Sequence, residues 1–286
     1  MTNSNRSRIL AGAIFIMCFA ASSFASAADK YLRFEQGGDT HYGILNGAMI
    51  DILAGGLFPM SEKSGRQVAL NSVSILPPTQ ASKVFAVGMN FASHISSQSD
   101  APPPLFLKLP TSLIGHRAPI LLPKDATNVH FEGELVLVIG KTAKNVSIEE
   151  APDYIFGVTA GNDLTERSWQ GSDLQWMRSK AADGFGPVGP VIATGVDYNN
   201  LLLTTRLNGE IVQQENTKNM IHKPSKVLSY LSRYFTLLPG DLIFMGTPGR
   251  TQALDNGDVV SVEIDAVGLI SNEIKRDQTI ATGAAL

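Results

Sequence analysis

The chain contains almost no cysteine: among its 286 residues there is one, Cys18. An intramolecular disulfide is therefore impossible, and zinc sites built from several thiolates are excluded. Cys18 also lies in a segment that we expect to be removed, which excludes a cysteine nucleophile from the mature protein. Stability must come from the apolar side chains, which are 44% of the residues and suffice for a substantial core.

An excess of charge of one sign is also missing. The chain has 23 basic and 26 acidic residues, and no cluster of Lys and Arg exceeds what a solvated surface carries. We therefore expect neither a nucleic-acid partner nor an anionic membrane surface. Internal repeats and low-complexity tracts are absent as well, which argues against a repeat architecture or a long disordered linker.

The first 27 residues have the three parts of a secretory signal peptide. Arg6 and Arg8 precede an apolar run at residues 9–21, and small residues follow up to Ala27. The apolar run is shorter than the ~20 residues that a membrane-spanning helix needs. We expect cleavage near Ala27, export to a bacterial periplasm and no stable membrane insertion afterwards. An uncleaved anchor is the alternative.

The rest of the chain divides into three predicted parts. Residues 28–75 form a small N-terminal β domain, because short apolar segments alternate there with glycine pairs. Within it, the polar residues 61–71 are predicted to be a link with one short helix. Residues 76–276 form the main domain, and residues 277–286 form a flexible tail.

The main domain is predicted to be rich in short strands. Residues 84–87 read as a buried strand, and residues 224–235 carry an apolar stripe at helical spacing. Ser147 and Glu150 fit a capping box at the start of a short helix. Asn208-Gly209 and Asn256-Gly257 are hairpin signals. Without regular alternation of strands and helices, we predict a predominantly β fold of the α+β class rather than a doubly wound parallel sheet.

Glu132 and Glu134 stand at the mouth of an apolar run, at residues 135–139. In a strand their side chains point to the same face, with Cα atoms roughly 7 Å apart. Two carboxylates so close repel each other unless a cation lies between them. An all-carboxylate set favours Mg²⁺, with Mn²⁺ or Ca²⁺ as alternatives to it, over zinc. The ordinary alternative is a solvated strand face.

The other candidate residues have structural explanations when they are taken singly. Asp163 and Thr247 could be turn residues, and His94 could be a structural histidine. Their order along the chain, however, resembles the fumarylacetoacetate hydrolase family over about residues 84–272. The resemblance is carried by blocks at residues 87–94, 132–134, 162–167 with Gln170, 180–190, 207–210, 216–221 and 238–248.

The resemblance implies a mixed β-roll or barrel preceded by a small β domain, and it implies a homodimer. It implies that Glu132, Glu134 and Asp163 bind the divalent metal. His94, on a lid segment, and Lys180 would be the catalytic residues, with His94 as the general base. The substrate would be held by a further set of side chains, namely Arg167, Gln170, Lys180 and Thr247.

Three carboxylates would leave half of a six-coordinate shell open, so a 2-oxo acid could chelate the metal and form an enolate. The leading hypothesis is hydrolysis of a carbon–carbon bond in an acylpyruvate such as fumarylpyruvate. Decarboxylation or tautomerisation of a related 2-oxo acid would use the same site. A third alternative is an exported binding protein with weakened catalysis, because Ser97 stands where many hydrolytic members have a glutamate.

Overall fold

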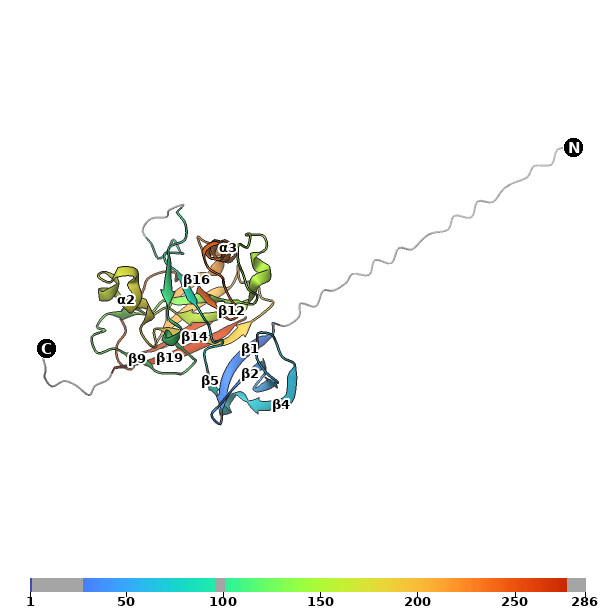
Figure 1. The fold of residues 1–286 in the computed structure, drawn as a ribbon. Helices are drawn as coiled ribbons and strands as arrows, with labels where there is room; N and C mark the ends of the chain where they lie inside the picture. Colours follow the sequence, from blue (N-terminus) through green and yellow to red (C-terminus); the bar gives the residue numbers. More distant parts are fainter. Residues whose placement is uncertain (2–27, 96–100, 277–286) are drawn as a thin grey trace.

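The computed structural model describes Met1, residues 28–95 and residues 101–276 (Figure 1). Apart from Met1, the predicted signal peptide lies outside these residues, and so do Ser97 and the predicted tail at residues 277–286. Within the described part of the chain, no helix is long and apolar enough to cross a membrane.

A mixed sheet of twelve strands runs through the whole molecule. Its order is β4-β3-β2-β1-β14-β12-β11-β17-β6-β7, with β5 beside β1 and β8 beside β14. The β17–β6 and β14–β8 pairs are parallel, and the other pairs are antiparallel. The strands are β1 (Lys30–Gln36), β2 (Asp39–Asn46), β3 (Met49–Leu53), β4 (Lys63–Ala69), β5 (Ser74–Ile75), β6 (Val84–Val87), β7 (Leu105–Lys108), β8 (Leu113–Ile114), β11 (Gly133–Ile139), β12 (Ile155–Asn162), β14 (Gly186–Ala193) and β17 (Leu242–Phe244).

A second sheet, in the order β16-β15-β18-β19-β9, packs against the first. Its strands are β9 (Ile120–Leu122), β15 (Leu202–Leu207), β16 (Glu210–Asn216), β18 (Val259–Ile264) and β19 (Gly268–Arg276). A short pair, β10 (Val129–His130) with β13 (Thr165–Glu166), stands apart. The main core cluster joins Leu135 and Val158 of the first sheet to Leu203 and Val262 of the second. The fold is therefore predominantly β, as predicted.

The N-terminal strands β1 to β5 lie at one edge of the molecule (blue to cyan in Figure 1). Strand β1 pairs with β14, so these strands extend the large sheet of the main body. The prediction of a short helix within residues 61–71 is wrong, because β4 occupies most of that segment. Pairing of Val68 with Ile50 of β3 satisfies the backbone and buries both side chains, which a polar isolated helix could not do.

The described residues form few α-helices, namely α1 (Arg167–Gln170), α2 (Met177–Ala181) and α3 (Pro224–Tyr234). The predicted helix at residues 224–235 is confirmed as α3, which buries Val227, Leu228 and Leu231 in the main core. The capping box also forms, with reciprocal Ser147–Glu150 hydrogen bonds of 3.1 and 3.2 Å. It introduces only the 3₁₀ turn η3 (Ala151–Tyr154). The other 3₁₀ turns are η1 (Leu70–Ser72), η2 (Pro110–Ser112), η4 (Leu174–Trp176) and η5 (Thr217–Asn219).

The two Asn-Gly turns have different outcomes. Asn208-Gly209 joins the paired strands β15 and β16, and both residues have the positive φ that this hairpin needs, 52° and 90°. Asn256-Gly257 is a turn, but it precedes β18, whose partners are β15 and β19. The hairpin prediction there is wrong. The amide of Gly257 instead bonds the carbonyl of Ile274 in β19, at 2.8 Å.

Candidate metal centre and active site

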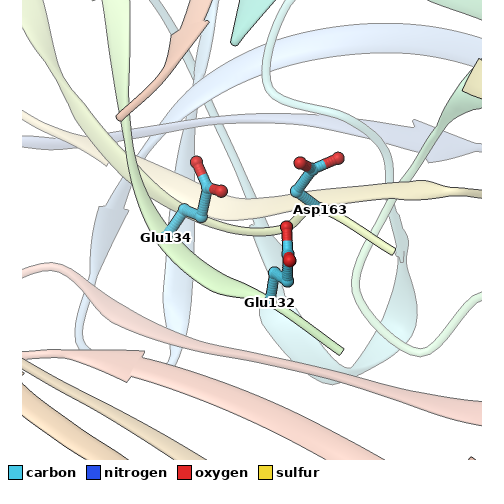
Figure 2. A group of neighbouring side chains, drawn as sticks. All are labelled: Glu132, Glu134 and Asp163. Atoms are coloured by element: carbon cyan, nitrogen blue, oxygen red, sulfur yellow. The ribbon is translucent and has the colours of Figure 1, made fainter. Parts of the chain in front are cut away.

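Glu132, Glu134 and Asp163 form a buried cluster where β11 and β12 meet. Gly133 pairs with Asn162, and the amide of Asp163 donates to the carbonyl of Glu132 at 2.8 Å, which places Asp163 beside the glutamates. One carboxylate oxygen from each residue lies within 4.8 Å of the others. Figure 2 shows the three side chains pointing toward a common space. The predicted ligand set is thus brought together.

Gly133 makes this arrangement possible. A Cβ atom there would lie 2.0 Å from Oγ1 of Thr205, on β15 of the second sheet. The two sheets approach each other at this point only because the residue between the two glutamates has no side chain. Packing between the sheets therefore fixes the backbone that carries Glu132 and Glu134.

Three cationic side chains approach the cluster from other elements. Lys180, on α2, places Nζ at 2.6 Å from Oε2 of Glu132 and 2.5 Å from Oδ2 of Asp163. Nζ of Lys108, at the end of β7, lies 2.6 Å from Oδ1 of Asp163 and also donates to the carbonyl of Lys180. Arg167, on α1, donates from Nη2 to Oε1 of Glu132 at 2.5 Å. Glu132 and Asp163 are thus each ion-paired, whereas Glu134 has no ion pair within the described structure.

These contacts shift the pKa values of Glu132 and Glu134 in opposite directions. Burial raises the pKa of Glu132, but the charges of Lys180 and Arg167 outweigh it and bring that pKa down to about 2. Burial also raises the pKa of Glu134, and there the charges of Asp163 and Glu132 add to the effect, so its pKa lies well above 4.5. Burial lowers the pKa of Lys180, but the charges of Asp163 and Glu132 raise it by a larger amount. The pKa therefore lies above its ordinary value, and the ammonium stays charged.

The donor set fits a divalent cation. Oε2 of Glu134 accepts the Gly246 amide at 2.6 Å, and this single hydrogen bond cannot offset the repulsion from two neighbouring carboxylates. All three carboxylates are less than 5% exposed, so water screens them poorly. Oxygen ligands without sulfur or nitrogen are those of a hard ion. An additional cation beside Glu134 would remove the repulsion.

The other predicted residues line the same pocket. His94, Arg167, Gln170, Lys180 and Thr247 all border a cavity of about 60 Å³ together with the three carboxylates. Nε2 of His94 lies 3.8 Å from Oε1 of Glu132. Gln170 accepts a 2.8 Å hydrogen bond from Nη1 of Arg167, which fixes the guanidinium. The structure therefore joins every predicted site residue in one place.

Sequence reasoning missed several residues that line this pocket or contact its lining. Lys108 is fully buried, and the signal for it was a single lysine in an apolar strand. Phe106 and Trp176 form an aromatic wall, with ring centroids 5.5 Å apart, and Nζ of Lys180 lies 4.8 Å from the Phe106 ring. Gln213 accepts from the Gly133 amide at 3.2 Å and donates to Oγ1 of Thr247 at 2.9 Å. No local pattern distinguishes Gln213 from an ordinary strand residue.

Two family models match the chain. Residues 83–275 match the model described as fumarylacetoacetate (FAA) hydrolase C-terminal, and residues 30–78 match the model described as Rv2993c-like, N-terminal. Protein Rv2993c of Mycobacterium tuberculosis is 44% identical over 219 residues, which are 74% of this chain and 83% of that protein. The mitochondrial oxaloacetate tautomerase fahd2 of Xenopus laevis is 36% identical over 71% of this chain and 69% of its own.

Solved structures agree with these matches. A 2-hydroxyhepta-2,4-diene-1,7-dioate isomerase from Mycobacterium marinum superposes with a TM-score of 0.83 at 38% identity, covering 88% of this chain and all of that one. A fumarylpyruvate hydrolase from Pseudomonas aeruginosa, in complex with Mn²⁺ and pyruvate, superposes with a TM-score of 0.66 at 28% identity. It covers 71% of this chain and 92% of that chain.

Proposed function

The chain belongs to the fumarylacetoacetate hydrolase family, and on that premise we propose that it is a divalent-metal-dependent enzyme that interconverts the keto and enol forms of a small 2-oxo acid. Mg²⁺ is the proposed metal. Mn²⁺ is an alternative, supported by the Pseudomonas aeruginosa hydrolase structure, and Ca²⁺ is the third candidate.

One observation carries the proposal: a base and a fixed cation converge on the carboxylate cluster. Nε2 of His94 lies 3.8 Å from Glu132, and Nζ of Lys180 lies 2.6 Å from the same carboxylate. A group that accepts a proton and a group that stabilises an anion thus face one small cavity. Formation of an enolate from a 2-oxo acid requires both.

A divalent cation held by Glu132, Glu134 and Asp163 would supply a Lewis acid at which the carboxylate and ketone of a 2-oxo acid are chelated. Lys180 has an N–H left after its two carboxylate bonds and can donate it to the developing anion. Arg167, held by Gln170 and by Thr251 at 2.9 Å, presents a second fixed charge. From keto to enol, His94 accepts the proton from the carbon next to the ketone and delivers it to the enolate oxygen, and the reverse reaction moves the proton back to carbon.

We favour tautomerisation over hydrolysis because it makes the smaller demand on His94, which only has to move a proton on the substrate. Hydrolysis also requires activation of water. The Xenopus laevis relative is named an oxaloacetate tautomerase, and the Mycobacterium marinum structure is titled an isomerase. A cavity of about 60 Å³ also favours a short acid over a long acyl chain.

The test is the decay of the enol absorbance of oxaloacetate with and without protein in the presence of Mg²⁺. We expect the wild type to accelerate the decay and His94→Gln to lose at least about 100-fold in kcat, as removal of a general acid–base group does. Glu134→Ala should remove the dependence on Mg²⁺. A surface variant, Gln214→Ala, is the matched control. Absence of acceleration by the wild type would refute the proposal.

Hydrolysis of an acylpyruvate is the second candidate, favoured by the similarity to the fumarylpyruvate hydrolase. The same site would stabilise the enolate of pyruvate as leaving group, while water activated by His94 attacks the distal carbonyl. Release of pyruvate from acetylpyruvate would identify this reaction, and release of CO₂ from oxaloacetate would identify a decarboxylase. Binding of oxalate without any turnover would identify a binding protein.

We also propose that the protein is exported to a periplasm after cleavage near Ala27, because residues 1–27 have the composition of a signal peptide. A mature N-terminus at Ala28 in the periplasmic fraction would support this, and one at Met1 would refute it. The homodimer remains a prediction, and light scattering of the purified protein would test it.

A further inference from the structure

The imidazole of His94 is held by a backbone carbonyl. Nδ1 lies 2.6 Å from the carbonyl oxygen of Gly249, while Nε2 is the ring atom near Glu132. A carbonyl oxygen can only accept, so this hydrogen bond requires a proton on Nδ1. In the neutral ring Nε2 is then the unprotonated nitrogen, and it faces the carboxylate cluster.

Among the described residues, no side chain packs where a Cβ of Gly249 would lie. Gly249 has a φ of +63°, and no atom lies within 4 Å of the position that a Cβ would take. Hydrogen bonds fix it instead. The Gly249 amide donates to Oγ of Ser93 at 3.0 Å, and the hydroxyl of Ser93 donates in turn to Oε2 of Glu215. Oε1 of Glu215 accepts from Asn219 at 3.0 Å.

Ser93 is the chain neighbour of His94, and the two residues bind the two peptide groups that flank the Cα of Gly249. Ser93 binds the Gly249 N–H and His94 binds the Gly249 carbonyl. Glu215, on β16 of the second sheet, anchors this pair through a charge-assisted bond, which is stronger than a neutral one. Gln213, two residues earlier on the same face of β16, bonds the carbonyl of Pro248 at 2.5 Å.

We propose that Ser93 and Glu215 are positioning residues, which hold the Gly249 carbonyl where it keeps His94 in its Nδ1–H tautomer with Nε2 free to accept a proton. They act through His94 and touch neither substrate nor metal. The assignment of His94 as the base rests on the proposed function, whereas its tautomer does not.

The experiment uses the purified protein, loaded with Mg²⁺. ¹⁵N NMR of the histidine rings reports which nitrogen of His94 carries the proton, and His94→Gln identifies the signal. We expect the Nδ1–H form in the wild type and a mixture of tautomers in Ser93→Ala and in Glu215→Ala. Ser93→Thr should restore the Nδ1–H form, because threonine keeps the hydroxyl.

Kinetics supply the second readout. Removing the anchor should lower kcat for the enol substrate about ten-fold, less than the loss of a general base itself, with KM changed less than about two-fold. The double variant Ser93→Ala/Glu215→Ala should be no worse than either single variant, because both residues act through one hydrogen-bonded chain. Gln214→Ala is the matched control, since its side chain lies on the same strand but bonds Thr204, at 3.1 Å.

The outcomes separate this proposal from the proposed function. If the wild type turns over no 2-oxo acid but shows the Nδ1–H tautomer, which Ser93→Ala then loses, the positioning role stands and the function fails. A wild type with the proton on Nε2 overturns the positioning role. A Ser93→Ala variant with unchanged tautomer and unchanged kcat overturns it as well. Mg²⁺ affinity should be equal in all variants, and a loss of it in Ser93→Ala would point to a general structural defect and against the proposal.

Discussion

Lys108 and Asp163 form an ion pair whose two side chains are both fully buried, with 2.6 Å between Nζ and Oδ1. Lys180 occupies the other oxygen of the same carboxylate, at 2.5 Å. Asp163 is therefore neutralised on both sides before any metal binds. Burial lowers the pKa of Lys108, and the adjacent Asp163 opposes that shift.

Lys108→Met should destabilise the metal-free protein, because it leaves a buried carboxylate with one cation fewer. Breaking a buried pair costs about 3–5 kcal/mol. Denaturant unfolding of the metal-free protein measures this. Lys275→Met is the control, because Lys275 pairs with Glu273 at the surface, at 3.3 Å, and should cost less than about 1 kcal/mol. Equal losses in both variants would show that the Lys108 pair is not held as described.

Glu134→Gln should abolish binding of Mn²⁺ and Mg²⁺ without destabilising the metal-free protein. Glu134 has no ion pair among the described residues and is repelled by Glu132 and Asp163. Replacing its carboxylate with a neutral amide therefore removes this repulsion. Titration calorimetry measures the affinity, and thermal unfolding with and without metal measures the stability that binding adds. Retained metal affinity would remove Glu134 from the ligand set.

Gly133→Ala should destabilise the protein by about 1–3 kcal/mol, the usual cost of overpacking. The new Cβ would lie 2.0 Å from Oγ1 of Thr205. Adding Thr205→Ala should recover most of the loss, because it deletes the clashing atom, which has no hydrogen-bond partner in the structure. A double-mutant cycle by denaturant unfolding checks this, and additive losses would mean that the two sheets are further apart than described.

Stability should decrease on mild acidification. Burial, with a smaller contribution from Lys226, lowers the pKa of His222, and burial lowers the pKa values of His116 and His130 too. Below the ordinary value of 6.5 the unfolded chain takes up protons that the folded state resists. Stability from these groups is therefore full above about pH 6.5 and is lost progressively as the pH falls from there through the lower pKa values of the folded state.

His222→Asn should flatten this dependence, because His222 is the one buried histidine among these three; its Nδ1 has no hydrogen-bond partner in the described structure. The measurement is the free energy of unfolding near about pH 7.5 and near about pH 5.5. His41→Asn serves as control, since its ring is partly exposed. A steeper pH dependence in His222→Asn would contradict the assignment.

The elements that could be predicted from sequence are those with strong local signals. Strand β6, helix α3 and the Asn208-Gly209 hairpin all have short-range patterns, and each of them forms. The failures occur where tertiary pairing outweighs local preference. Strand β4 forms because β3 offers it a partner, and Asn256-Gly257 turns back onto β19 instead of closing a hairpin. Neither partner is visible from the local sequence.

The sequence, through its resemblance to the fumarylacetoacetate hydrolase family, predicted a set of Glu, Asp, His, Arg, Gln, Lys and Thr residues that the structure brings to one pocket. Only the tertiary structure decided which cationic side chain pairs with which carboxylate. Lys108 and Gln213 join the site from strands that are remote in sequence, and the carbonyl of Gly249 reaches His94 across 155 positions. A backbone carbonyl leaves no trace in residue identity, so only the tertiary structure brings the Gly249 carbonyl to the ring of His94, the proposed base.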